Sequence, residues 1–132
     1  MTVLVGYVPT PLGEATLRAG VEEARRRAER LVVVNMSRDD VLVDAHRARS
    51  DDLARVERDV AELGIDVEVV RIEKGGDPAE ALVGAGEERS ASVIVIGLRH
   101  RSPVGKLIMG SNAQRILLDA RCPVLAVKED TA

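Results

Sequence analysis

The chain has 132 residues, of which 45% are apolar, and its formal net charge is −3. This length predicts a single domain with a substantial core, and this composition is not that of a disordered chain. Tyr7 is the only aromatic residue, which argues against binding of single-stranded nucleic acid by stacked bases. The interspersed charges offer no general surface for nucleic acid or membrane.

Targeting signals and redox chemistry are not evident in the sequence. It has neither a signal peptide nor an apolar run long enough to span a membrane, so we expect a cytoplasmic protein. Cys122 is the only cysteine and cannot form an intrachain disulfide. We interpret it as a buried structural thiol rather than a nucleophile.

The first part of the chain predicts a strand, a helix and a second strand. Residues 2–8 are a buried apolar strand. Thr10 can cap the helix that follows, Pro11 suits its first position, and Glu14 completes a capping box. Residues 31–36 form the second buried strand. The helix between them has an apolar stripe at helical spacing: Leu17, Val21, Ala24 and Ala28.

A second helix is predicted by four apolar residues at helical spacing before Gly64, which stops it. Residues 37–50 come before this helix and have no clear pattern, so they are either a lid or a plain insertion. His46 lies in this stretch, and we interpret it as an exposed loop residue. The apolar stripe of the helix consists of Leu53, Val56, Val60 and Leu63.

Residues 65–72 alternate largely between apolar and charged side chains, which is typical of a strand at a sheet edge. A third helix then begins, with Asp77 as its cap, Pro78 at the first position and Glu80 three residues after the cap. Its buried side is predicted to consist of Ala79, Leu82, Val83 and Gly86.

The last part of the chain predicts a strand, a loop, a helix and a strand. Residues 93–96 are apolar on both faces, as a central parallel strand requires. Residues from Pro123 to Lys128 form the fifth strand. The alternation of strands and helices predicts an α/β fold: a three-layer α/β/α sandwich with a five-stranded parallel sheet, Rossmann-like. The stripe of the last helix consists of Ala113, Ile116, Leu117 and Ala120.

The loop between Gly97 and Gly110 leads from the fourth strand to the last helix. Such a connection can hold a phosphate, because the first N–H groups of a helix lack intrahelical partners and glycine lets the backbone approach a ligand. A second interpretation needs no ligand: Ser111 and Gln114 have the spacing of a capping box. The loop also carries the basic residues Arg99, His100, Arg101 and Lys106.

In open parallel sheets, ligands bind at the carboxyl ends of the strands, where the chain direction reverses. With the first strand central, this crevice lies between the first and fourth strands. The segments that would meet there contain Val8, Pro9, Thr10, Ile96, Gly97, Gly110 and Ser111.

Five sequence motifs resemble those of the universal stress protein family, and the resemblance covers essentially all of residues 1–132. The motifs are Val-Leu-Val-Gly-Tyr, Gly-Gly-Asp-Pro-Ala-Glu, Ser-Val-Ile-Val-Ile-Gly, Ser-Pro-Val-Gly-Lys-Leu-Ile-Met-Gly-Ser and Ala-Arg-Cys-Pro-Val-Leu-Ala-Val. The family implies the strand order 3-2-1-4-5 and a homodimer, often paired through the last strand.

Many members of this family bind ATP through a motif of spaced glycines followed by Ser or Thr. The resemblance places Gly97 at the first glycine, Gly110 at the last and Ser111 at the hydroxyl. It also implies that ATP, with or without Mg²⁺, lies near Arg99 and the backbone of Asn112, among other residues.

Three residues depart from what ATP-binding relatives usually carry, and one of them is Ala113, at a position that often has a second hydroxyl in relatives. His100 stands where the second glycine is expected, and it either contacts a phosphate or blocks one. Val8 stands where ATP-binding relatives usually carry Asp, which removes a carboxylate near the nucleoside. Met36 fits an apolar wall beside the adenine and equally fits the core.

Three functions follow from this sequence. The first is a stress-response module that binds an adenine nucleotide. The second, favoured by His100 and Val8, is a dimeric interaction or protective module that binds no nucleotide. The third, an enzyme, has the least support, since we find no Ser-His-Asp set, Walker P-loop or metal-spaced cluster, so slow ATP hydrolysis is the most that we expect.

Overall fold

The computed structural model describes residues 1–36, 43–72, 75–98 and 110–128, with the backbone alone for residues 43–52. Strands and helices alternate along these ranges. In chain order they are β1 (Thr2–Tyr7), α1 (Pro11–Arg27), β2 (Arg30–Asn35), α2 (Val43–Glu62), β3 (Val67–Arg71), α3 (Pro78–Glu88), β4 (Ala91–Leu98), α4 (Ser111–Asp119) and β5 (Val124–Lys128).

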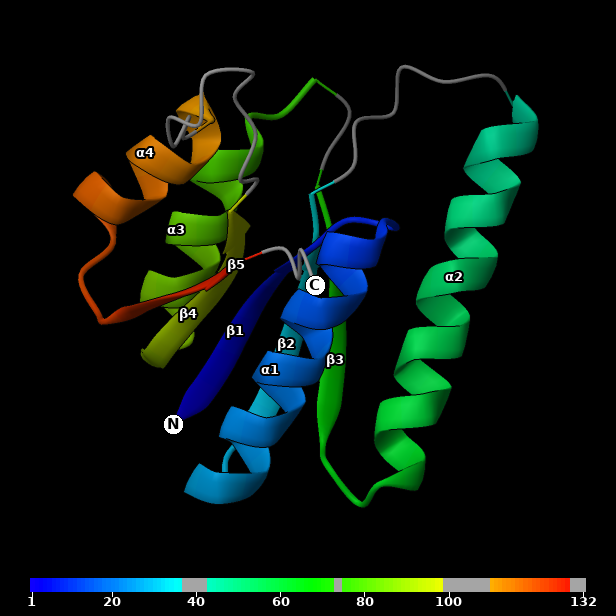
Figure 1. Cartoon of the computed structure of the whole chain (residues 1–132), viewed down its shortest axis with the longest axis horizontal. Helices are drawn as coiled ribbons and strands as arrows, with labels where there is room; N and C mark the ends of the chain where they lie inside the picture. The colour runs from blue at the N-terminus through cyan, green and yellow to red at the C-terminus, as the bar shows by residue number, and fades with distance from the viewer. Residues whose placement is uncertain (37–42, 73–74, 99–109, 129–132) are drawn as a thin grey trace.

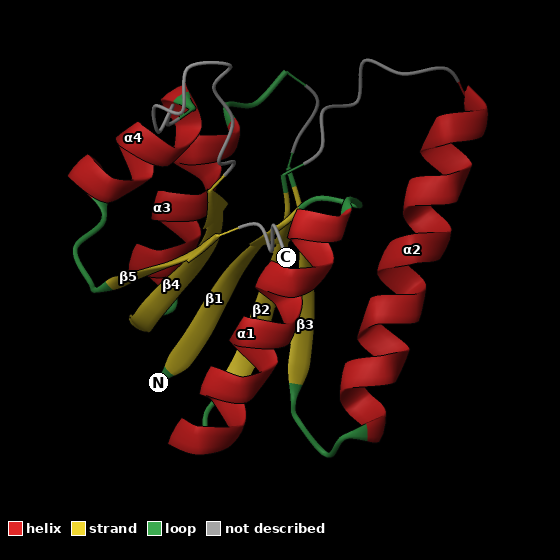
Figure 2. Cartoon of the chain, viewed as in Figure 1, coloured by secondary structure: helices red, strands yellow, loops and turns green. Residues whose placement is uncertain are grey.

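The five strands form one parallel sheet in the order β3-β2-β1-β4-β5. Helices α1 and α2 cover one face, and α3 and α4 cover the other (Figures 1 and 2). The predicted three-layer sandwich and strand order are therefore confirmed.

Side chains alternate between the two faces along each central strand, because successive strand residues point in opposite directions. Val3 and Val5 of β1 pack with Leu17 of α1 on one face. Leu4 of β1 packs with Leu82 of α3 on the other. The central strands are apolar on both faces because helices cover both faces.

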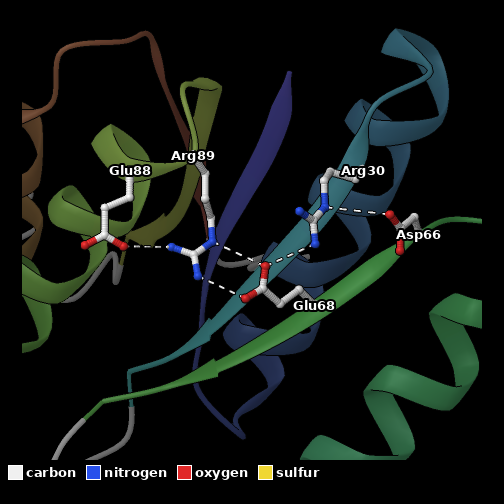
Figure 3. A network of polar contacts seen from close by, with 5 residues as sticks. All are labelled: Arg30, Asp66, Glu68, Glu88 and Arg89. Atoms are coloured by element: carbon white, nitrogen blue, oxygen red, sulfur yellow. Dashed lines mark hydrogen bonds and ion pairs between the residues drawn. The ribbon is translucent and has the colours of Figure 1, made fainter.

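An ion-pair network holds the edge strand β3, which was predicted to be an exposed edge (Figure 3). Glu68 of β3 accepts hydrogen bonds from Arg89 at 2.9 and 3.3 Å and from Arg30 at 3.1 Å. These hydrogen bonds lower the pKa of the Glu68 carboxyl, and the bond from Arg89 has the largest effect. Asp66 and Glu88 pair with the two arginines at the ends of the network.

The second helix differs from its prediction at both ends. It begins at Val43, so residues 43–50 are helical, and His46 lies in a helix rather than a loop. This stretch is polar but has no Gly or Pro and contains good helix formers. Leu63, assigned to the stripe, lies beyond the helix and is 58% exposed. The remaining residues 37–42 lie outside the described residues.

The last helix is also less buried than its stripe predicted. Ile116 is 2% exposed, but Leu117 is 39% exposed and its neighbour Leu118 is 82% exposed. Helix α4 therefore rests on the sheet through a narrow contact centred on Ile116. At the end of the first helix, Ala28 is not part of the apolar stripe but a left-handed C-cap with φ 54°.

Candidate functional site

A pocket of about 450 Å³ opens at the carboxyl ends of the central strands. The ends of β1 and β4 form its floor, and the first turns of α1 and α4 form its sides. This is the crevice between the first and fourth strands that the sheet order predicts. Its lining consists of Gly6, Val8, Leu12, Gly13, Thr16, Met36, Ile96, Gly97, Leu98, Gly110, Asn112, Ala113 and Ile116.

Six of the residues predicted from the sequence line this pocket: Val8, Met36, Ile96, Gly97, Gly110 and Asn112. Three others lie beside it without lining it. Pro9 is exposed, Ser111 is exposed in the first turn of α4, and Thr10 caps α1. Arg99 and His100 lie outside the described residues.

Thr10 shows why a predicted site residue does not line the pocket. Its Oγ1 accepts a hydrogen bond from the Gly13 N–H at 3.0 Å, so the hydroxyl serves the helix start. The Glu14 carboxylate does not complete this cap as predicted. It accepts instead from the Tyr7 hydroxyl at 2.9 Å and from Arg55 at 2.8 Å.

The α1 wall was missed by the sequence reasoning. A Cβ added at Gly13 would lie 1.6 Å from the Val8 carbonyl oxygen, so α1 begins in direct contact with the end of β1. A Cβ at Gly97 would lie 2.6 Å from Oγ1 of Thr16, so α1 also packs closely on β4. The spacing of Gly13, Thr16 and Gly20 was an available signal, because small residues on one helix face permit close approach to a sheet.

The start of α4 resolves the choice between a capping box and an open helix end. Gly110 is the N-cap, with φ −65° and ψ 156°, and no side chain caps the helix among the residues described. Ser111 is the first helical residue, one position too late to cap. The capping box of Ser111 and Gln114 is therefore wrong. The first N–H groups of α4 lack intrahelical partners, and no described atom lies within 4 Å of a Cβ added at Gly110.

Helix α4 is fixed in direction by an ion pair to α3. Arg115 donates to the Asp77 carboxylate, and this bond lowers the pKa of Asp77. The other Asp77 oxygen accepts from the Ala79 N–H at 3.0 Å and caps α3, as predicted from the sequence. One carboxylate thus sets the start of α3 and orients the helix that borders the pocket.

The described lining of the pocket carries no charged side chain. Thr16 donates its hydroxyl to the Leu12 carbonyl at 2.7 Å, which leaves Asn112 as the described lining side chain whose polar atoms have no partner among the described residues. Within the described ranges, no group of three or more His, Cys, Asp or Glu residues could hold a metal. The pocket is therefore suited to an apolar or aromatic moiety on its floor and an anion at the α4 end.

Cys122 lies elsewhere, beside a smaller hollow of about 310 Å³ between α3 and the start of β5. It is partly rather than fully buried. Burial raises the pKa of the Cys122 thiol, so the thiol stays protonated at neutral pH and is a weak nucleophile.

Across the ranges that the structure describes, no helix is both long and apolar enough to cross a bilayer.

Comparisons with known proteins point to one family. The model of the universal stress protein family matches residues 1–128. A universal stress protein from Mycolicibacterium smegmatis is 45% identical over 126 residues, which is 96% of each chain. A universal stress protein structure from Archaeoglobus fulgidus has a TM-score of 0.78 at 30% identity and covers 96% of this chain and 97% of that one.

A second structure from Archaeoglobus fulgidus is a universal stress protein in complex with dAMP. Its TM-score is 0.71 at 24% identity, over 96% of both chains. At this identity the likeness establishes the fold alone.

Proposed function

The chain belongs to the universal stress protein family, and we propose that it binds an adenine nucleotide in the pocket between β1 and β4. The observation that carries this proposal is the start of α4, which no described side chain caps, at the rim of a largely apolar pocket. An adenine needs an apolar slot, and a phosphate needs N–H donors. The pocket offers these two features at opposite ends.

The phosphate end lies at Gly110, Ser111 and Asn112. Their N–H groups belong to the first turn of α4, where the helix dipole also favours an anion. Glycine at the cap leaves the backbone accessible, because no described atom fills the space that a side chain would occupy. The sequence adds Arg99 and Lys106 in the preceding segment, which lies outside the described residues.

The base end is assigned to Val8, Met36 and Ile96, which line the pocket. These side chains offer van der Waals contact to an aromatic ring and no charge. The pocket volume of about 450 Å³ falls within the usual range for small-ligand sites. A relative of the same fold was solved with dAMP, which is in keeping with a nucleotide of this class.

Calorimetric titration of nucleotide-stripped protein tests the proposal. ATP is titrated with and without Mg²⁺, with AMP and GTP in parallel and adenosine to separate the base from the phosphate. We expect binding of adenine nucleotides, weaker binding of GTP because the slot is built by apolar contacts, and weaker binding of adenosine because it lacks the anion. Absence of both heat and a thermal shift with every nucleotide would refute the proposal.

The second candidate, a dimeric module without nucleotide, is favoured by one observation. Val8 lines the pocket and brings no carboxylate to the nucleoside end. If the titration fails, this candidate stands, and function then lies in the surfaces of the dimer.

We further propose that the chain forms a homodimer through β5, whichever candidate holds. This strand is an edge of the sheet, next to β4 alone, and its five residues are half-buried or exposed. Leu125 is 37% exposed on it. An unpaired apolar edge strand favours pairing with a second copy, which satisfies its free N–H and C=O groups. Sedimentation equilibrium tests this, and a monomer at high micromolar concentration would refute it.

A further inference from the structure

Tyr7 connects three segments around the proposed nucleotide pocket: the ends of β1 and β2 and the first turn of α1. It is the last residue of β1 and is 1% exposed. Its carbonyl oxygen accepts from the Met36 N–H at 2.7 Å, and its hydroxyl donates to Oε1 of Glu14 at 2.9 Å. The residue after it, Val8, lines the pocket. A single side chain and its backbone thus join the ends of β1 and β2 to the first turn of α1.

Glu14 receives a second donor from α2, of which no described side chain lines the pocket. Arg55 of α2 donates to the same Oε1 atom at 2.8 Å. Arg55 also reaches Asp59 on its own helix at 3.4 Å. We call Tyr7, Glu14 and Arg55 the clasp, because they join β1, α1 and α2 through one carboxylate oxygen.

Two members of the clasp adjoin pocket-lining residues in the sequence. Val8 follows Tyr7, and Gly13 precedes Glu14. These two lining residues are already in tight contact, since a Cβ on Gly13 would lie 1.6 Å from the Val8 oxygen. The Glu14 carboxylate thus forms its bonds directly beside the point where α1 and the end of β1 are in contact.

We propose that the clasp couples nucleotide binding to α2, with Glu14 and Arg55 as positioning residues that hold the α1 wall of the pocket. The inference rests on the proposed nucleotide binding. A ligand seated between β1 and α1 favours the closed clasp, and the closed clasp favours the ligand by the same factor, because coupling between two equilibria is reciprocal. The attachment of α2 to α1 through Arg55 and Glu14 therefore responds to ligand binding in the pocket.

The sole tyrosine allows a direct test. Protein labelled with 3-fluorotyrosine has one ¹⁹F resonance, from Tyr7, and adenine absorbance does not interfere with it. We expect AMP to shift this resonance in the unsubstituted protein. Glu14→Gln keeps the side-chain volume and removes the charge, and Arg55→Ala removes the second donor. Each is expected to weaken AMP binding about fivefold, and Arg55→Lys to restore part of the loss.

Two control variants match the charge changes. Arg58→Ala removes an exposed arginine three residues further along the same helix. Glu23→Gln removes a carboxylate of α1 that pairs with Arg26 and Arg27, far along the helix from the pocket. Both are expected to keep the AMP affinity and the shift of the resonance.

A purely structural clasp gives a different pattern. Glu14→Gln and Arg55→Ala would then lower the melting temperature but bind AMP as tightly as Arg58→Ala does, and this result would overturn the proposal. A double variant with both Glu14→Gln and Arg55→Ala tests whether the two residues act together. Losses that add would mean that the two residues act separately, and losses that do not add support one shared unit.

Hydrogen exchange without ligand separates this inference from the nucleotide proposal. In Glu14→Gln the amides of Gly13 and Met36 are expected to exchange faster than in Arg58→Ala, since the clasp positions both. Unchanged exchange would refute the positioning role whatever the ligand. Faster exchange in a protein that binds no nucleotide would support the positioning role of the clasp, but it would refute the nucleotide proposal and with it the coupling.

Discussion

Replacing Gly110 by valine is expected to abolish or strongly weaken nucleotide binding and leave the fold intact. The backbone at Gly110 has φ −65° and ψ 156°, which any L-residue adopts. A Cβ there meets no described atom within 4 Å. The binding loss follows because the same open space is the approach of the phosphate to the first N–H groups of α4.

The expected change in the free energy of unfolding is much smaller than the expected loss of binding free energy. Loss of glycine at an N-cap costs roughly 0.5–1 kcal/mol of stability. Reduced freedom of the unfolded chain returns about 0.4–1 kcal/mol, so the free energy of unfolding changes by close to zero. Hydrogen bonds to a charged ligand contribute about 1.5–3 kcal/mol each, so losing one weakens the Kd roughly tenfold to a hundredfold.

The matched control is Gly97→Ala, at the other motif glycine. Its Cβ would lie 2.6 Å from Thr16 Oγ1 and 2.9 Å from Leu12 Cγ, so these side chains or α1 itself must shift. We expect a stability loss of about 1–3 kcal/mol, the usual range for overpacking. Urea unfolding and calorimetry on both variants give the two readouts. A Gly110→Val protein with unchanged affinity would refute the reasoning and place the ligand elsewhere.

Three further predictions concern the dimer edge, the ion-pair network and α4. Leu125→Arg is expected to weaken the dimer without unfolding the monomer, and an unchanged dimer in sedimentation would move the interface off β5. Glu68→Gln should lower stability at pH 7 by less than about 1 kcal/mol, because the pair with Arg89 is partly solvated. The pKa of Glu68 is lowered from its ordinary 4.5. The stability that ionised Glu68 contributes to the wild-type protein is therefore present above that value and is lost as the pH falls through the folded pKa. Acid unfolding curves of the wild type and the Glu68→Gln variant should converge there. Ile116→Ala should cost about 2–5 kcal/mol, whereas Leu118→Ala should change stability by under about 0.5 kcal/mol in urea titrations, and equal effects would contradict the burial of α4.

Much of the fold could be read from local patterns. The apolar runs of β1, β2 and β4 predicted buried strands, and the cap of α3 by Asp77 was predicted to the residue. Such signals are local, because a cap or a stripe needs only residues within one or two turns. Alternating strands and helices, with right-handed crossovers, then predicted the parallel layers. The strand order came from the family resemblance.

The candidate site was predicted in part. The ends of β1, β2 and β4 and the start of α4 were named from the sequence, because strand ends and glycine loops are visible there. Leu12, Gly13 and Thr16 were not named, since their place in the pocket depends on α1 lying against β1 and β4. Local spacing also suggested a cap at Ser111, where one residue of shift decides between a capped and an open helix.

The sequence by itself determined the elements, their alternation and the crevice at the strand ends, because these depend on periodicity and on general rules of chain connection. The tertiary structure alone decided which side chains share a contact. The sequence predicts that Glu14 closes a local cap, but Glu14 binds Tyr7 and Arg55, the latter 41 positions away. A carboxylate takes the donors that lie nearest in space and offer the best geometry, and for residues so far apart in the chain that distance exists only once the sheet and helices have packed.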